Sequence, residues 1–331
     1  MITTPDIKEL NELSQWLQHV PYEVIRYQLY NAKDLYKGYE PKDDPEDDKA
    51  SLAQCYDMRT YKHYIDEGKV TTRVNESLAR AIHDNSIYCS LVEFMEPRDP
   101  NLCVGIMGGH AIKRSDPMFE KVVLMSKRLT EEGFLMVSGG GPGAMEATHL
   151  GAWMAGHSGA KTKEVVAELA KAAETSKDHK WVSSALDIMA RYPQTKYESL
   201  GVPTWLYSQE PSTPFATHIA KFFENSVRED VILSISVGGI IYTPGSAGTL
   251  QEIFQDAGQN HYLSHGLSSP MIFLGKHFWT EEVPVYSLIK HLLEKGKYQN
   301  LQLTLTDDMD EVESVLKEFQ KTMVTAKPPM N

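Results

Sequence analysis

The sequence predicts an α/β protein built on a doubly wound parallel sheet. The first indication is a series of short, uninterrupted apolar segments from residue 101 onward. The second is that amphipathic helical patterns separate these segments, an alternation typical of a parallel sheet covered by helices on both faces. The third is a pair of glycine-rich junctions at which an apolar segment runs into a helix. Ligands of such sheets bind beyond the carboxyl ends of the strands, where both junctions fall.

Residues 1–97 differ in character and are expected to form a helical N-terminal segment. Apolar side chains recur there at helical spacing, at Leu10, Leu13, Trp16, Leu17 and Val20. The acidic run at 42–48 is expected to be a solvated loop. This segment carries no motif that indicates chemistry, so a role in packing or assembly is the default.

The sheet domain is expected over 98–322, with a tail at 323–331. We expect strands at 102–107, 134–137, 202–206, 237–242, 271–274 and 301–305. The stretch at 157–200 is far longer than an ordinary connection between strand and helix, so it is predicted to be a helical insertion. We expect helices at 116–132, 143–156, 163–174 and 181–190.

The composition excludes several classes of protein. Lys and Arg number 33 against 45 Asp and Glu, and the net charge of −12 argues against nucleic-acid binding and against anionic membranes. Only Cys55, Cys89 and Cys103 occur, an odd number without metal-ligand spacing, which favours reduced thiols. The N-terminus has no secretory pattern and no apolar run approaches membrane-spanning length, so we expect a cytoplasmic protein.

The junction at 240–252 is the strongest candidate for a functional site. Gly245 and Gly248 let the backbone turn sharply and approach a ligand, and the helix that follows begins with free N–H groups and a positive dipole end. The predicted phosphate-binding turn therefore comprises Gly245, Ser246, Ala247, Gly248 and Thr249. Glu252 places a carboxylate close to this turn and is the first catalytic candidate.

A second junction, at 135–146, raises the significance of the first, because glycine-rich turns alone are common in α/β proteins. Two such junctions in one sheet make a cleft. The residues expected to line it as further substrate contacts are Gly108, Gly109, Gly140, Gly143, Met145 and Glu146. Glu146 has two interpretations of equal weight: a ribose or base contact, or a carboxylate that matches the helix dipole.

The known nucleotide motifs for redox and phosphoryl transfer do not occur. The first turn lacks the G-x-G-x-x-G pattern, the second strand ends in Val137-Ser138-Gly139 without an acid, and no Gly-Lys-Ser or Gly-Lys-Thr follows a strand. The histidines lack the two-His helix pairing of zinc peptidases. We therefore expect neither a cofactor nor a metal.

Together, the two junctions resemble the Lonely Guy (LOG) family of nucleoside 5′-monophosphate phosphoribohydrolases and related bacterial nucleotide nucleosidases, over about residues 101–320. The family motif P-G-G-x-G-T-x-x-E matches Pro244, Gly245, Gly248, Thr249 and Glu252, with Ser246 in place of the second glycine. The family motif G-G-G-x-x-G-x-M matches Gly139, Gly140, Gly143 and Met145, with Ser138 in place of the first glycine.

The resemblance extends to two further positions. An arginine that the family keeps one helix upstream of the phosphate turn corresponds to Arg228, whereas the adjacent family lysine is Glu229 here. A family acid after the third strand corresponds to Glu210.

The resemblance implies a Rossmann-like fold of the LOG type and cleavage of a nucleoside 5′-monophosphate to free base and ribose 5-phosphate. It also implies that Arg228 and Glu252 are catalytic and that the protein forms a homodimer or a larger homo-oligomer. One alternative is a nucleotide-binding regulator without turnover, for which Ser246 and Glu229 leave room. An amino-acid decarboxylase ranks low, because no lysine is marked for a pyridoxal Schiff base. The sequence does not identify the base.

Overall fold

The structure is a computed structural model and describes residues 7–207 and 211–326. Within these residues, seven strands form one parallel sheet in the order β4-β3-β2-β1-β5-β6-β7. The strands are β1 (Cys103–Met107), β2 (Leu135–Ser138), β3 (Ser199–Gly201), β4 (His218–Ile219), β5 (Gly239–Tyr242), β6 (Pro270–Leu274) and β7 (Gln302–Thr306). The predicted α/β fold with a doubly wound parallel sheet is confirmed.

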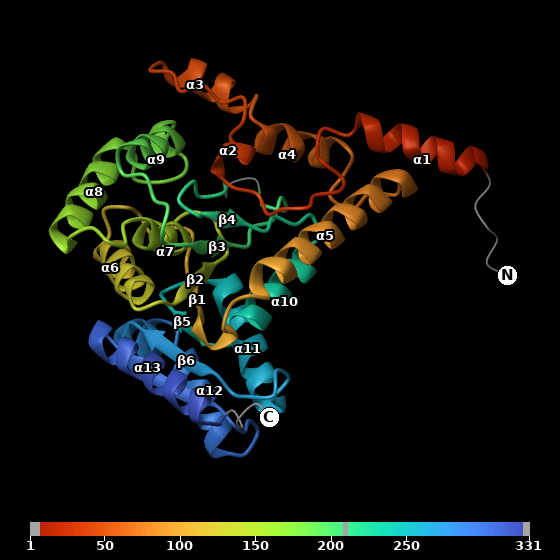
Figure 1. Ribbon diagram of the computed structural model, residues 1–331. Helices are drawn as coiled ribbons and strands as arrows, with labels where there is room; N and C mark the ends of the chain where they lie inside the picture. The colour runs from red at the N-terminus through yellow and green to blue at the C-terminus, as the bar shows by residue number, and fades with distance from the viewer. Residues whose placement is uncertain (1–6, 208–210, 327–331) are drawn as a thin grey trace.

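Helices cover both faces of the sheet, with α6 to α9 on one side of the strands and α5, α10 and α11 on the other (Figure 1). The N-terminal helices are α1 (Ile7–His19), α2 (Ala32–Leu35), α3 (Pro45–Leu52), α4 (Tyr56–Asp66) and α5 (Val74–Met95). The others are η1 (Pro100–Leu102), α6 (Pro117–Glu131), α7 (Ala144–Trp153), α8 (Gly159–Ala172), α9 (Lys180–Arg191), α10 (Asn225–Ile235), α11 (Ala247–Tyr262), η2 (Phe278–Glu282), α12 (Val285–Glu294) and α13 (Met309–Ala326). Among the described residues, no helix combines the length and the apolar character needed to cross a bilayer.

Two hydrophobic cores lie on opposite faces of the sheet. Ile240 and Tyr242 of β5 point into the core formed with α10, α11, α12 and the N-terminal segment. Ile241, between them, points into the core formed with α6, α7, α8 and α13. Because successive side chains of a strand point to opposite faces, a strand that is buried on both sides has no polar alternation, which explains the uninterrupted apolar segments.

Five of the six predicted strands lie within two residues of the observed bounds, but the strand predicted at 202–206 is wrong. β3 ends at Gly201, before Val202 and Pro203. A proline has no N–H to donate to the ladder, so 202–206 continues only as an isolated bridge between Thr204 and Phe222, although Val202 and Trp205 are buried. β4 has two residues, too few to give a periodic signal.

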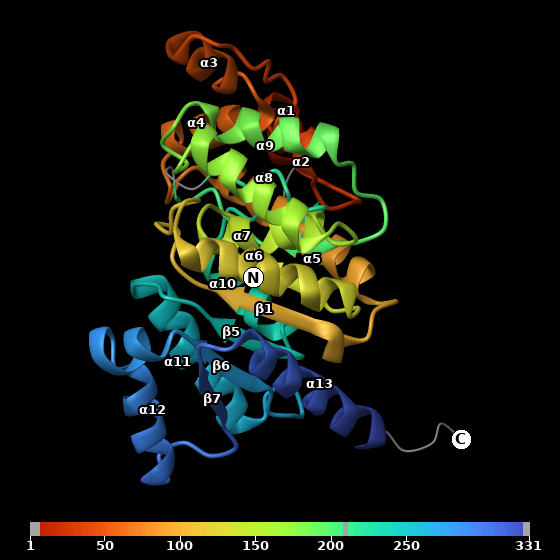
Figure 2. The same cartoon turned by 90° about the vertical axis from the view of Figure 1, so that its left-hand side faces the viewer.

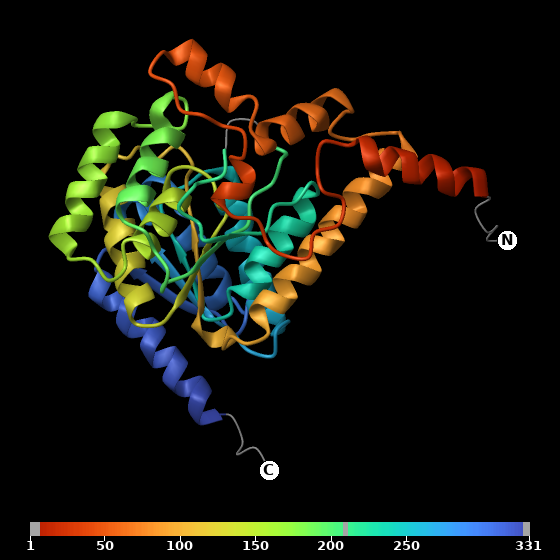
Figure 3. The same ribbon diagram turned by 45° about the horizontal axis from the view of Figure 1, so that its top comes forward.

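The N-terminal helices and the insertion lie at one end of the sheet, and α12 and α13 lie at the other (Figure 2). Tyr30 forms an antiparallel bridge with Ile219 of the edge strand β4. Of the acidic run predicted as a loop, 42–44 lie outside a helix, but 45–48 form the start of α3, which projects from the body of the molecule (Figure 3). Asp44 caps this helix and its acidic residues lie in the first turn, where the helix dipole favours them.

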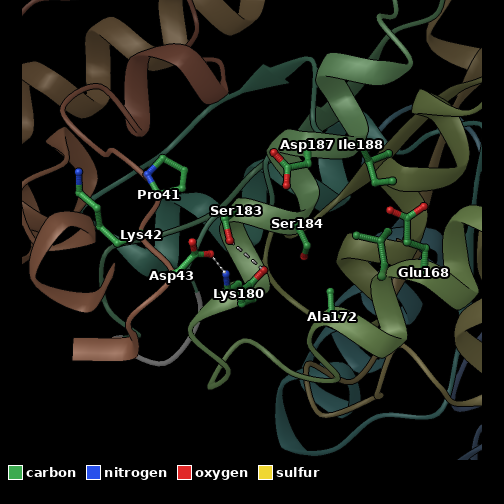
Figure 4. A pocket seen from close by; sticks show the side chains of 11 residues that line it. Pro41, Lys42, Asp43, Glu168, Ala172, Lys180, Ser183, Ser184, Asp187 and Ile188 are labelled. Atoms are coloured by element: carbon green, nitrogen blue, oxygen red, sulfur yellow. Dashed lines mark hydrogen bonds and ion pairs between the residues drawn. The ribbon is translucent and has the colours of Figure 1, made fainter. Parts of the chain in front are cut away.

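The predicted insertion is confirmed as helical and forms α8 and α9. A hollow of about 260 Å³ separates these helices from the N-terminal segment at 41–43 (Figure 4). Lys180 of α9 spans the two parts and forms an ion pair of 2.9 Å with Asp43. At the other end of the chain, α13 continues to Ala326, so the first four residues of the predicted tail are helical.

Candidate active site

The candidate site lies where the strand order reverses. From β1 the chain adds β2, β3 and β4 on one side, and then β5, β6 and β7 on the other. Met107, the last residue of β1, pairs with Tyr242, the last residue of β5. The turns that follow these strands therefore leave the sheet at the same edge, which is the position at which open α/β sheets bind ligands.

The turns after β1, β2 and β5 contact one another through their backbones. Gly109 N donates to Pro244 O over 3.0 Å, and Ala144 N donates to Gly109 O over 3.2 Å. Thr243 N donates to Met107 O over 2.9 Å. The turn after β1 is thus held between the two glycine-rich junctions.

Glycine is required where these backbones meet. A Cβ atom on Gly108 would lie 1.8 Å from Thr243 Oγ1. Gly143 has a φ of +68° and its Cβ would lie 2.4 Å from Gly109 O. A side chain at Gly108 would collide with that of Thr243, and one at Gly143 would collide with a backbone carbonyl. These collisions explain the predicted glycine pattern.

The junction between β2 and α7 is buried, and protein groups bind its polar atoms. Ser138, at the family's glycine position, accepts a hydrogen bond from Gly140 N through its hydroxyl over 3.1 Å. The same hydroxyl bonds His149 Nε2 over 2.8 Å, and burial lowers the pKa of His149 to about 3, so the ring is neutral. Gly140 O accepts from Thr213 N over 2.8 Å. The hydroxyl of Ser138 therefore fixes the backbone of this turn through its hydrogen bonds.

Glu146, in the first turn of α7, is held by a buried ion pair. Arg114 contacts its carboxylate twice, through Nε at 3.0 Å and through Nη2 at 2.5 Å, and both side chains are only 1% exposed. Trp181 of α9 donates to Oε2 over 3.0 Å. Sequence reasoning missed Arg114, which lies in an irregular loop with no motif around it. The pair joins the helix of this junction to the insertion.

The junction between β5 and α11 is different because its turn is exposed. Ser246, Ala247 and Gly248 are exposed, and no atom lies within 4 Å of a Cβ built on Gly248. The Ser246 side chain makes no capping hydrogen bond to the start of α11. The start of α11 is thus exposed, and the first N–H groups of a helix have no acceptor within it, as the predicted anion site requires.

The departure from the family glycine pattern at Ser246 has a local explanation. Ser246 has a φ of −119°, a conformation open to any residue, so no glycine is needed there. Thr249 lies against Gly245, where a Cβ would stand 2.1 Å from the threonine Oγ1. The threonine hydroxyl is therefore placed beside the turn.

Arg228 of α10 lies between the two junctions. Its Nε donates to Val202 O over 2.7 Å, and its Nη1 lies 3.9 Å from Glu252 Oε1. A Cβ on Gly139 would lie 2.2 Å from Arg228 Nη2 and 2.6 Å from Met145 Sδ. The side chains of Arg228 and Met145 therefore pack directly against this glycine. The side chains of Arg228 and Glu252 are 11% and 13% exposed. The structure therefore brings together the arginine, the carboxylate and the open turn.

The residue next to Arg228 in the sequence joins α10 to α11. Glu229, which stands in place of the family lysine, accepts from Asn225 Nδ2 over 2.7 Å and from Gln251 Nε2 over 2.5 Å. It thereby links α10 to the residue before Glu252. Glu210 lies outside the described residues. Within 7–207 and 211–326, no group of three or more His, Cys, Asp or Glu side chains is arranged to hold a metal.

The fold and site define a class: an α/β protein with a candidate anion site at the switch point of a parallel sheet. No protein-family model matches the sequence, and no curated protein matches it. Among solved structures, that of TM1055, a structural genomics target, is 17% identical, with a TM-score of 0.43, over 65% of this chain and 98% of its own. The molybdenum cofactor binding protein of the phototrophic bacterium Rippkaea orientalis is 14% identical, with a TM-score of 0.41. That match covers 66% of this chain and 96% of the other protein. Likeness at this level assigns no function.

Proposed function

We propose that the protein hydrolyses the N-glycosidic bond of a nucleoside 5′-monophosphate to give a free base and ribose 5-phosphate. The observation that carries the proposal is the arrangement at the start of α11. There an exposed helix N-terminus faces open space, and the Glu252 carboxylate and the Arg228 guanidinium lie beside it.

The 5′-phosphate binds the N–H groups of the turn from Gly245 to Thr249. These groups have the positive helix dipole behind them, and the chain's net charge of −12 makes such a local anion site necessary. Holding the phosphate fixes the ribose, and the reaction becomes a positioned, near-unimolecular step.

Glu252 acts at the anomeric carbon. As the bond between C1′ and the base nitrogen breaks, C1′ gains positive charge, which a carboxylate nearby stabilises. Water attacks C1′, the bonding electron pair leaves with the base, and the proton lost by the water completes the free base. The carboxylate also orients the water or a ribose hydroxyl.

Arg228 remains charged throughout, so it serves as an electrostatic group and not as a base. Its position between Gly139 and Glu252 suits it to bind the phosphate or to stabilise the departing base. For Glu146 we propose a structural role, because Arg114 and Trp181 occupy both of its carboxylate oxygens.

The test is to incubate the purified protein with a panel of nucleoside 5′-monophosphates and the matching nucleosides, and to follow free base by chromatography. We expect release from at least one monophosphate and none from its nucleoside. Equal release from both would contradict the phosphate-binding turn.

A nucleotide-binding regulator without turnover is the second candidate. The observation that favours it is Glu229, which adds an acid beside Gln251 where the family has a lysine. If no monophosphate releases base but one raises the thermal midpoint, the regulator is the better interpretation.

A further inference from the structure

A buried hydrogen bond joins the two ends of the β5–α11 junction. Tyr242 is the last residue of β5, and its hydroxyl donates to Asp256 Oδ2 of α11 over 2.6 Å. The two side chains are 0% and 3% exposed. The segment that they enclose contains the whole anion-binding turn and Glu252.

Both partners of this bond are fixed to rigid elements. Asn260 Nδ2 donates to Asp256 Oδ1 over 3.1 Å, and Asn260 Oδ1 accepts from Ser269 N over 2.8 Å, next to the start of β6. Trp279 Nε1 donates to the backbone carbonyl of Tyr242 over 3.1 Å. Asp256 therefore anchors α11 to the end of β5, and Asn260 anchors the same helix beside the start of β6.

Glu252 precedes Asp256 by four residues, so the two carboxylates lie on the same side of α11, one turn apart. We propose that Tyr242 and Asp256 are positioning residues that set the rotation and height of α11 and thereby place Glu252 at the reacting carbon. This inference rests on the proposed function for the role of Glu252.

The start of the turn is held separately. Thr243 N bonds to Met107 O, and Gly109 N bonds to Pro244 O, and neither contact involves Asp256. Loss of the Tyr242 hydroxyl should therefore move Glu252 more than it moves the phosphate site. The chemical step depends on placement to within about 1 Å, so kcat should fall while KM stays nearly constant.

Tyr242→Phe tests this directly, and Tyr286→Phe is the matched control. Both tyrosines pack against Phe273, with ring centroids 5.1 Å and 5.2 Å away, but only Tyr242 bonds Asp256. We expect Tyr242→Phe to lower kcat about 10-fold with KM within about twofold, and the control to match the wild type. Asp256→Asn, which keeps an oxygen acceptor for Tyr242, should retain more of kcat than Asp256→Leu.

Wild-type kcat in a folded Tyr242→Phe, or an equal loss in the control, would overturn the inference. If Tyr242→Phe does not fold, the double variant Tyr242→Phe with Asp256→Leu replaces the pair by apolar groups and leaves no buried carboxylate without its tyrosine donor. The same fall in kcat is then expected, and an unchanged kcat is the contradictory result.

Backbone hydrogen exchange over residues 250–257 provides a measurement that needs no turnover. We expect faster exchange in Tyr242→Phe than in Tyr286→Phe, because the turns of α11 that carry Glu252 and Asp256 lose their anchor. If the wild type releases no base but exchange differs as expected, the proposed function fails and the anchoring role stands. Equal exchange in both variants contradicts the anchoring role whether or not the wild type is active.

Discussion

The two glycine-rich junctions have the same local plan but different surroundings. Each passes from a buried strand through a glycine turn into a helix that carries a carboxylate near its start. Around Gly140 the turn is buried, its backbone bonds Ser138 and Thr213, and Glu146 is paired with Arg114. Around Gly248 the turn is exposed and faces open space.

This difference shows that a glycine-rich turn indicates backbone geometry and not, by itself, a ligand. The partners of the N–H groups and of the carboxylate decide the role. Where protein groups occupy them, the junction stabilises the fold. Where the turn is exposed and two charged side chains lie beside it, as Glu252 and Arg228 do, we propose that the junction binds a substrate.

Glu252→Gln should abolish activity without weakening the fold. The amide has nearly the same shape but cannot offset positive charge at C1′, so we expect kcat to fall about 10³-fold. The thermal midpoint should stay close to that of the wild type. Base release and thermal unfolding measured on the same preparation check this, and retained turnover would remove Glu252 from the mechanism.

Glu146→Gln should have the opposite profile. It leaves the Arg114 guanidinium, which is 1% exposed, without its counter-charge. Breaking a buried pair in this way costs about 3–5 kcal/mol of the free energy of unfolding. Urea denaturation measures the loss, and the protein that remains folded should keep its turnover. A stable but inactive Glu146→Gln variant would instead identify Glu146 as a substrate contact.

Gly143→Ala and Gly248→Ala each add one methyl group, the first to the buried turn and the second to the exposed turn. The methyl group at position 143 meets a backbone carbonyl at a positive φ, so we expect a loss of about 2 kcal/mol in stability. At position 248 the methyl group meets open space, so stability should hold or rise slightly while monophosphate binding weakens.

Gly258→Ala is the control for the second variant, because it also adds a methyl group to α11 in open space but away from the turn. It should leave binding unchanged. Equal losses of binding in Gly248→Ala and Gly258→Ala would place the ligand elsewhere.

The buried acid behind the exposed turn should make stability depend on pH. Burial raises the pKa of Asp256 from 3.8 to about 7, with Tyr242 opposing the shift. The unfolded chain releases this proton at lower pH, so the folded state loses stability as pH rises from about 4 towards 7, by about 1 kcal/mol per pH unit.

Asp256→Asn removes this titration and should show a flatter profile over the same range. The other charged groups near α11, which include Arg228, Glu229, Asp230 and Glu252, and the neutral Tyr242 hydroxyl are the same in both proteins, so their contributions cancel in the comparison. Denaturation midpoints measured at several pH values in both proteins test the expectation. Parallel profiles would contradict it.

The sequence predicted the sheet well because strands buried on both faces leave a clear apolar signal. It failed at 202–206, where buried apolar residues give the same signal but Pro203 interrupts the ladder and leaves only an isolated bridge. It identified the exposed turn because glycine and helix start are local features. It could not find Arg114 or the bond between Tyr242 and Asp256, because these contacts join residues far apart in the chain or in different elements.

The most direct test of the contrast is to titrate ribose 5-phosphate into isotopically labelled protein and follow the backbone amide resonances of both turns. We predict that the largest shifts occur at Gly245, Gly248 and Thr249, whose N–H groups bind the phosphate. Gly140 and Gly141, in the buried turn, should shift little. The largest shifts at the buried turn, with Gly248 unmoved, would contradict the division between a structural and a functional junction.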